Sequence, residues 1–208
     1  ANDEIINGVS ERGGFSVTKK KMLQWSMRIG AYAQRLIDGL ETINWPDSIK
    51  EIQRNWIGRS IGASVEFKVY KSDIKIEVFT TRPDTIFGAT FLTVAPEYKS
   101  VNNLITIDKA ETASDYIKKS SLKSNRDRIS NVKLISGVFT GSYAVHPFSK
   151  EKLPIWISDY VIGDYGTGAV MAVPCGDQRD FEFAKFFKIK ILNIFDGIDV
   201  SEKAYTQK

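Results

Sequence analysis

The feature that most constrains the fold is a change in hydrophobic spacing part-way along the chain. In residues 65–69 and 74–78, apolar side chains alternate with polar or charged ones across a short polar turn. Successive side chains of a strand point to opposite faces, so the two runs predict a β-hairpin with one buried face. The second run reaches Thr80 and Thr81, and Pro83 should end its ladder pairing.

Short strands are predicted along most of the remaining chain. They are expected at 89–95, 134–145, 154–162, 168–173 and 189–195, with helices at 108–131 and 178–187. Many short strands with few helices favour an α+β, mainly β fold: a closed or nearly closed β-barrel with peripheral helices. An open α+β sheet is the alternative. A Rossmann core is disfavoured because strand and helix do not alternate regularly.

The segment before these strands has helical spacing. Apolar residues recur every three or four positions over 18–39, and a second helix is expected from Asp47, as its N-cap, to about Trp56, with Gly58 as its stop. The predicted organisation is a helical lead-in at 1–57, a main domain at 58–196 and a linker tail at 197–208. Core or packing positions are expected for Trp25, Trp45, Trp56 and Trp156.

Composition disfavours the commonest hydrolytic sites. The 208 residues include one cysteine, Cys175, and one histidine, His146, too few for a His/Cys zinc site and leaving little room for a catalytic triad. His146 is expected in a surface or turn role, and Cys175 is expected to be a small packed or half-exposed residue. With no disulfide possible within the chain, a reducing, cytoplasmic compartment is predicted.

Charge and hydropathy limit the possible partners. The net charge of +4 permits an anionic partner without requiring one. No apolar run approaches the length that spans a bilayer, so no membrane partner is expected. The basic stretch at 118–133 is expected to be a solvated helix face.

Polar side chains are concentrated directly after the predicted hairpin. Residues 80–85 carry three hydroxyls, a guanidinium and a carboxylate. Pro83 fixes a turn, so these groups can fan out toward a carbonyl, a ribose or a water. The alternative is a plain turn in which Asp84 caps backbone amides and Arg82 pairs with a surface acid.

A second polar segment follows an apolar strand that ends in Pro174. Asp177 can cap the next helix, and Asp180 lies in its first turn. The helix dipole favours an ionised carboxylate there, and such a carboxylate could hold an ammonium group. The alternative is a capping pair with no ligand.

These segments together resemble the editing domains of class I aminoacyl-tRNA synthetases. Thr-Thr-Arg-Pro-Asp-Thr at 80–85 is similar to the threonine-rich signature in its leucyl-enzyme form, and residues 165–180 resemble the second signature. Residues 53–60 resemble the leucyl-enzyme segment that leads into the editing domain. Many bacterial members carry a histidine at the place of Gly176, so this sequence departs from the family pattern at that position.

The resemblance implies the β-barrel-like editing domain of a bacterial-type leucyl-tRNA synthetase, preceded by a short helical segment from the synthetic domain. It implies hydrolysis of the ester that joins a wrong amino acid, such as norvaline or isoleucine, to tRNA(Leu). The implied partners are the mischarged 3′ end and the remainder of the synthetase chain, and a monomer is expected. The synthetic signatures are absent, so no cofactor is expected here; ATP and Mg belong to the synthetic domain.

The resemblance also implies roles for individual residues. Asp180 would bind the substrate α-ammonium, while Thr80 and Thr81 would contact the aminoacyl or ribose end and help to place water. Thr85 would reject the leucine side chain, and Tyr165 would lie beside the adenosine. The remaining substrate-binding positions implied are Arg82, Asp84, Met171, Val173 and Asp177. No metal is expected.

Two other functions stay open from the sequence. One is the editing domain of a valyl or isoleucyl enzyme, against which Asp84 and the Asn-Trp-Ile-Gly run at 55–58 argue. The other is an RNA-binding β-barrel without catalysis, which would show salt-dependent affinity and no turnover.

Overall fold

The computed structural model of the chain describes residues 5–6, 9–17, 23–123, 128, 134–163 and 166–207. Its contacts divide the chain into two units, residues 20–61 and a larger unit of residues 1–19 and 62–208. The domain boundaries expected from the sequence, after residues 57 and 196, stay predictions. In the larger unit, the short strands β1 (Ile5–Ile6) and β2 (Val9–Ser10) pair antiparallel near its start.

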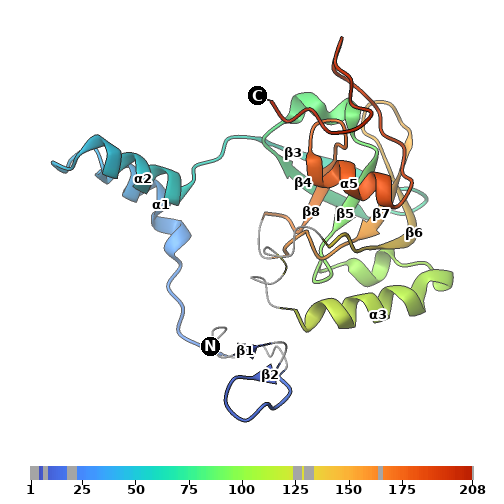
Figure 1. Ribbon diagram of the computed structural model, residues 1–208, viewed down its shortest axis with the longest axis horizontal. Coiled ribbons are helices and arrows are strands. Elements are labelled where there is room, and N and C mark those ends of the chain that lie inside the picture. Colours follow the sequence, from blue (N-terminus) through green and yellow to red (C-terminus); the bar gives the residue numbers. More distant parts are fainter. Residues whose placement is uncertain are drawn as a thin grey trace. The chain divides into compact units, whose positions relative to one another are not determined.

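The larger unit is built on one six-stranded mixed sheet (Figure 1). Its strands are β3 (Ala63–Val69), β4 (Lys75–Thr80), β5 (Phe91–Val94), β6 (Val138–Val145), β7 (Lys152–Ile157) and β8 (Ala169–Ala172). The order is β4-β3-β6-β7-β5-β8, and only β5 and β7 pair in parallel. The two end strands, β4 and β8, contact each other, so the sheet is nearly closed. The predicted barrel-like architecture is confirmed.

The hairpin predicted from alternating hydrophobic residues is β3 and β4. Val65 pairs with Val78, and Phe67 pairs with Ile76. Phe67 and Ile76 are completely buried, whereas the alternating charged residues are exposed. Fully burying a side chain of this kind contributes about 1.5–3 kcal/mol, so a one-residue slip in register would expose the apolar face.

Helices cover the sheet. Helix α3 (Ala110–Ser121) contacts β6, and α5 (Gln178–Phe186) packs over β5 and β8 through Phe183 and Ala184 (Figure 1). The rings of Phe183 and Phe91 stack with 5.1 Å between their centroids. Three 3-10 helices join these elements: η3 (Pro83–Gly88), η4 (Val101–Leu104) and η5 (Ile107–Lys109).

Two predicted elements differ from the structure. The helix expected over 108–131 ends as an α-helix at Ser121, and residues 124–127 and 129–131 lie outside the described part. The strand expected over 189–195 is absent, although Ile191 and Ile194 pack against the core. Burial alone explains the apolar residues of that segment, so their pattern did not require a strand.

The smaller unit contains η2 (Ile29–Tyr32), α1 (Ala33–Gly39) and α2 (Asp47–Ile57). The helix predicted over 18–39 was wrong for residues 23–28, which are not helical, and residues 18–22 lie outside the described part. That stretch buries no apolar face, and packing of such a face supplies most helix stability in proteins. Gly58 ends α2 at φ 67° as predicted, but Pro46 is the N-cap in place of Asp47.

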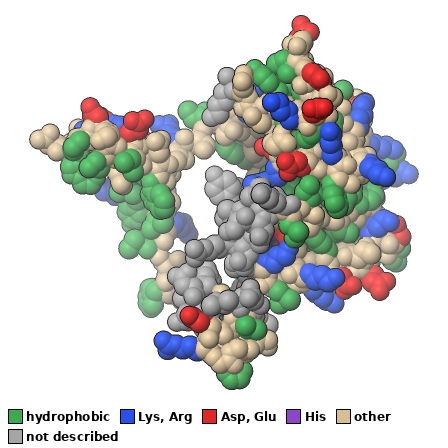
Figure 2. Space-filling model, in the orientation of Figure 1, with side chains coloured by type: hydrophobic (Ala, Val, Ile, Leu, Met, Phe, Trp, Pro, Cys, Tyr) green, Lys and Arg blue, Asp and Glu red, His purple; other side chains and the backbone are tan. Residues whose placement is uncertain are grey.

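Apolar side chains of the smaller unit lie at its surface (Figure 2). Trp25, Trp45 and Trp56 are exposed, so the packing role predicted for them was wrong for this chain. Trp156 does pack, with its ring centroid 4.5 Å from that of Phe187. Among the described residues, no helix has the length and apolarity needed to cross a membrane.

Candidate functional site

A pocket of about 570 Å³, including space open to solvent, joins the two polar segments that the sequence singled out. Its lining residues are Thr80, Thr81, Arg82, Thr85, Met171, Val173, Gly176, Asp177, Asp180 and Phe195. The first four follow or end β4, and the next two lie on or just after β8, so contact between the end strands of the sheet brings the segments together. Of the predicted site residues, Asp84 lies outside this lining, and Tyr165 lies outside the described residues.

Asp180 is the buried carboxyl of this pocket, with 8% of its surface exposed. Its Oδ2 accepts a hydrogen bond from the backbone N–H of Val173 at 2.9 Å, and its Oδ1 accepts one from the Tyr160 hydroxyl at 3.1 Å. The Tyr160 hydroxyl is also 3.1 Å from Oγ1 of Thr93. Both carboxyl oxygens therefore have a fixed partner.

Asp177 caps α5, as the sequence predicted. Its Oδ1 accepts hydrogen bonds from the backbone N–H groups of Arg179, at 2.8 Å, and Asp180, at 3.1 Å. An aspartate N-cap satisfies amides that lack partners in the first turn of a helix. The cap therefore fixes the start of α5 and, with it, the position of Asp180.

The electrostatics of Asp180 differ from the sequence expectation. Burial, with a smaller contribution from the charge of Asp177, raises the pKa of Asp180 to about 7. The hydrogen bonds from Val173 and Tyr160 favour the charged form, but they do not offset the loss of solvent. The prediction that Asp180 stays ionised was therefore wrong as stated: near neutral pH, ionised and neutral forms coexist.

The loop after β4 is held by short-range hydrogen bonds. Oγ1 of Thr80 accepts from the backbone N–H of Arg82 at 3.0 Å, and the Thr85 hydroxyl donates to the Arg82 carbonyl at 2.9 Å. Thr85 is buried, with 6% exposure, whereas Thr81 is exposed. The loop thus presents Thr80 and Thr85 to the pocket with their hydroxyl groups held by hydrogen bonds.

Arg82 and Asp84 form an exposed ion pair within this loop. The Arg82 Nη2 and Nε donate to the two carboxylate oxygens of Asp84 at 2.8–3.2 Å. Arg82 lowers the pKa of Asp84, chiefly through this hydrogen bonding, and Asp84 raises the pKa of Arg82. The plain-turn interpretation was right that Arg82 pairs with a surface acid, but Asp84 does not cap η3 with its side chain.

Three residues near the site were not singled out as binding residues from the sequence. Phe195 and Gly176 line the pocket. Tyr160 lies outside the lining, and its hydroxyl is hydrogen-bonded to the Asp180 carboxyl. No local pattern marks Phe195 or Tyr160, since their positions depend on long-range packing. A Cβ on Gly176 would lie 3.5 Å from the Phe195 ring and 3.6 Å from Val173, an ordinary contact, so the backbone does not demand glycine there.

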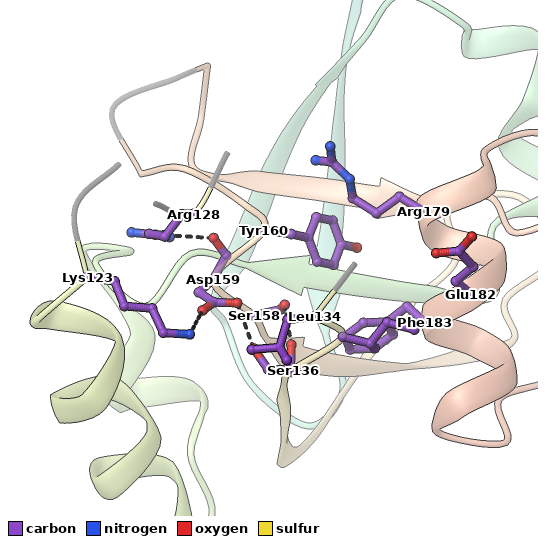
Figure 3. Close-up of a pocket in the computed structure, with 11 residues that line it drawn as sticks. Lys123, Arg128, Leu134, Ser136, Ser158, Asp159, Tyr160, Arg179, Glu182 and Phe183 are labelled. Carbon is purple, nitrogen blue, oxygen red and sulfur yellow. Dashed lines mark hydrogen bonds and ion pairs between the residues drawn. The ribbon is translucent and has the colours of Figure 1, made fainter. Parts of the chain in front are cut away.

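A second pocket, of about 530 Å³, is lined by Tyr160 and by residues of α5 (Figure 3). Two of the cationic residues that line it, Lys123 and Arg128, form hydrogen bonds within the fold. Arg128 donates to Glu97 at 2.6 Å and to the carbonyl of Val161 at 2.7 Å, while Lys123 donates to Asp159 at 2.6 Å. The solvated face predicted for 118–133 was therefore wrong for these two residues, and 124–127 and 129–133 lie outside the described part.

The single histidine and cysteine take no part in the site pocket. His146 lies in the β6–β7 turn, as predicted, but it is buried, with 2% exposure; its Nε2 is 3.0 Å from the Ile86 carbonyl. Cys175 is packed, as predicted, and burial raises the pKa of its thiol. Within the described ranges, no cluster of His, Cys, Asp or Glu could hold a metal ion.

Comparison with known proteins identifies the family. A family model described as leucyl-tRNA synthetase, editing domain, matches residues 54–208. The chain belongs to this family. Leucine–tRNA ligases of Flavobacterium johnsoniae and Christiangramia forsetii are 61% and 59% identical to it, over the whole chain and 22% of each relative. These matches are to leucine enzymes, so the valyl or isoleucyl alternative is set aside.

A solved leucyl-tRNA synthetase shares the editing-domain fold. The enzyme of Agrobacterium radiobacter K84, crystallised in a ternary complex with tRNA and LeuAMS, matches with a TM-score of 0.73 and 38% identity. The match covers 95% of this chain and 24% of that enzyme. The chain thus spans about a fifth of the length of the curated relatives that it matches.

Proposed function

We propose that this chain hydrolyses the ester joining a wrong amino acid, such as norvaline or isoleucine, to tRNA(Leu), as the editing part of a leucine–tRNA ligase. The observation that carries the proposal is the pocket in which a buried, oriented Asp180 carboxyl is combined with the threonine loop at 80–85. Membership of the editing-domain family supports the reaction, and the tRNA in the Agrobacterium complex supports the partner.

Asp180 would bind the α-ammonium of the aminoacyl group. Its partners among the described residues are an N–H and an O–H, with no cation hydrogen-bonded to it. An ammonium group within hydrogen-bond distance would favour the ionised carboxylate, and charge-assisted hydrogen bonds are about twice as strong as neutral ones. Since the pKa of Asp180 is about 7, binding near neutral pH would release a proton from part of the population.

The ester would then be cleaved by an oriented water. Its oxygen attacks the carbonyl carbon, the bond to the ribose oxygen breaks, and the ribose oxygen leaves with a proton. Thr80 and Thr81 would help to hold the ester and the water, and a neighbouring ribose hydroxyl could assist proton transfer. Rate enhancement would come mainly from orientation and fixed dipoles.

Thr85 would supply the discrimination against leucine. One missing or displaced methylene changes binding in an apolar pocket by only about 1–3 kcal/mol, so a single synthetic site cannot reject every analogue. Thr85 is buried in the pocket wall, and its hydroxyl is bound to the Arg82 carbonyl, which fixes its bulk in place. A γ-branched side chain would meet that bulk, with Met171 and Val173 forming other parts of the wall.

The direct test is deacylation of isoleucyl- or norvalyl-tRNA(Leu) by the intact enzyme that carries this chain. We expect multiple turnovers with free amino acid and intact tRNA as products. Salt-dependent tRNA binding without ester cleavage would favour the RNA-binding module and contradict the proposal. The position of Tyr165 beside the adenosine, the monomeric state and the cytoplasmic location stay predictions.

A further inference from the structure

A chain of hydroxyl groups leads from Asp180 away from the pocket and into the core. The Tyr160 hydroxyl is 3.1 Å from Oδ1 of Asp180 and 3.1 Å from Oγ1 of Thr93, a completely buried residue of β5. The Tyr160 ring packs against Phe183 with 5.7 Å between centroids, and its hydroxyl points toward α5 (Figure 3). Neither Tyr160 nor Thr93 lines the site pocket.

These three groups can be hydrogen-bonded in two directions without moving a heavy atom. Tyr160 has one proton for its two partners, and both Tyr160 and Thr93 are hydroxyls. When Asp180 is ionised, Tyr160 can therefore donate to the carboxylate while Thr93 donates to the Tyr160 oxygen. When Asp180 carries the proton, it donates to Tyr160, which donates to Thr93. Rotation of the O–H bonds alone interconverts the two arrangements.

The two arrangements are not equally favourable. In the ionised arrangement, both hydroxyl protons, those of Tyr160 and Thr93, have an acceptor. In the protonated arrangement the Thr93 proton must find another acceptor, and among the described residues its hydroxyl bonds only to Tyr160. A buried donor without a partner is costly, so the hydroxyl chain favours the carboxylate form of Asp180.

Among the described residues, the charges with the largest influence on the Asp180 carboxyl are those of Asp177 and Arg179. On its own helix, Asp177 opposes its ionisation and Arg179 favours it. Across the pocket, Arg82 is held by Asp84. Burial is the largest influence against ionisation, and the opposing groups are the Val173 N–H, the Tyr160 hydroxyl and Arg179. Tyr160 thus supplies the side-chain hydrogen bond that counteracts, in part, the effect of burial on Asp180.

We propose that Tyr160, supported by Thr93, is a positioning residue that holds Asp180 in the orientation and ionisation state that receive the substrate ammonium. Tyr160 would act through Asp180 and not on the substrate. The link to the ammonium rests on the proposed editing function, whereas the effect of Tyr160 on Asp180 does not.

The first measurement is independent of hydrolysis. In the 208-residue chain, carboxyl-carbon NMR follows the titration of Asp180 in the unaltered protein and in Tyr160→Phe, which keeps the ring and removes the hydroxyl. A hydrogen bond to a charged group corresponds to roughly one pKa unit, so we expect the midpoint to rise by about one unit. Thr93→Val, which is close in shape, should raise it by less.

Tyr143→Phe is the matched control, because Tyr143 lies on β6 outside the pocket lining. It should leave the Asp180 midpoint unchanged. An unchanged or lowered midpoint in Tyr160→Phe would overturn the proposal. Thr93→Val leaves the aromatic packing intact, so an unchanged midpoint in that variant would overturn the role of Thr93 even if the aromatic variant unfolds.

The second measurement is the pH profile of deacylation by the intact enzyme. A rise of one unit in the midpoint should lower kcat/KM about tenfold at pH 6, with a smaller loss as pH increases. A loss that is the same at every pH would indicate a packing defect and contradict the positioning role. If the NMR midpoint moves but the unaltered enzyme shows no deacylation, the hydroxyl chain is supported and the proposed function is contradicted.

Discussion

Two aspartates on segments that border the same pocket occupy opposite environments. Asp84, in the loop after β4, is exposed and paired with Arg82, which lowers its pKa. Asp180, in the first turn of α5, is buried, and its pKa is raised to about 7. A carboxylate that already has a cation can shape a loop. A buried carboxyl whose hydrogen-bond partners, in the described part of the chain, are an N–H and an O–H retains the capacity to bind an incoming ammonium.

The largest expected effect on activity comes from neutralising the buried aspartate, Asp180. Asp180→Asn keeps the size of the side chain but removes the charge that would pair with the substrate. Breaking a buried ion pair costs about 3–5 kcal/mol, so kcat/KM for isoleucyl-tRNA deacylation should fall roughly 10²- to 10⁴-fold. The measurement is single-turnover deacylation by the intact enzyme, with Asp84→Asn as the matched control. Equal activities in the two variants would remove the distinction between the aspartates.

The next largest effect concerns Thr85, which shares the loop with Asp84 but is buried. Thr85→Ala removes bulk from the pocket wall, so correct leucyl-tRNA should become a substrate. Relief of a clash of about 1–3 kcal/mol predicts a 10- to 100-fold increase in leucyl-tRNA deacylation. Thr112→Ala, on the exposed surface of α3, is the control. If leucyl-tRNA stays intact with Thr85→Ala, the steric role is wrong.

The raised pKa of the buried Asp180 also predicts that the folding stability of the chain depends on pH. Because the folded pKa of Asp180, about 7, lies above its ordinary value of 3.8, its contribution is fully present below about pH 4 and is lost as pH rises to about 7. The difference is at most about 4 kcal/mol. Chemical denaturation of the unaltered chain and Asp180→Asn should therefore show Asp180→Asn gaining relative stability between pH 4 and 7. A pH-independent difference would mean that burial does not raise the pKa of Asp180.

The smallest effect on activity and stability is expected at the exposed aspartate, Asp84. Asp84→Asn keeps a hydrogen-bond acceptor for Arg82 but removes the charge. Exposed ion pairs contribute little, so kcat/KM for isoleucyl-tRNA should change by less than about fivefold, and the melting temperature should be nearly unchanged. A loss as large as that of Asp180→Asn would show that the loop pair takes part directly in catalysis.

The sequence predicted what depends on local spacing. The alternation of apolar and polar residues predicted the β3–β4 hairpin. The position of Asp177 directly before a helical segment predicted that it caps α5. The parallel pairing of β5 with β7 could not be predicted in this way, because no local pattern specifies which distant strand is a neighbour.

The ionisation of Asp180 was misjudged for the same reason. The helix-dipole argument uses only the position in the first turn, whereas the pKa depends on how much solvent the folded chain excludes. The roles of Tyr160 and Phe195 likewise follow from tertiary packing. For Trp25, Trp45 and Trp56 the error has the opposite sign. Their apolar character predicted burial, but no described residue of this chain covers them, and they are exposed.

The central claim is that the Asp180 carboxylate binds the α-ammonium, and a binding cycle tests it most directly. Two non-hydrolysable norvalyl-adenosine amides, one with the α-amino group and one with hydrogen in its place, are titrated into the intact enzyme and its Asp180→Asn variant. Removal of the amino group should weaken binding to the unaltered enzyme by roughly tenfold or more, with little further loss in the variant. An equal loss in both proteins would show that Asp180 does not bind the ammonium, and would contradict the account.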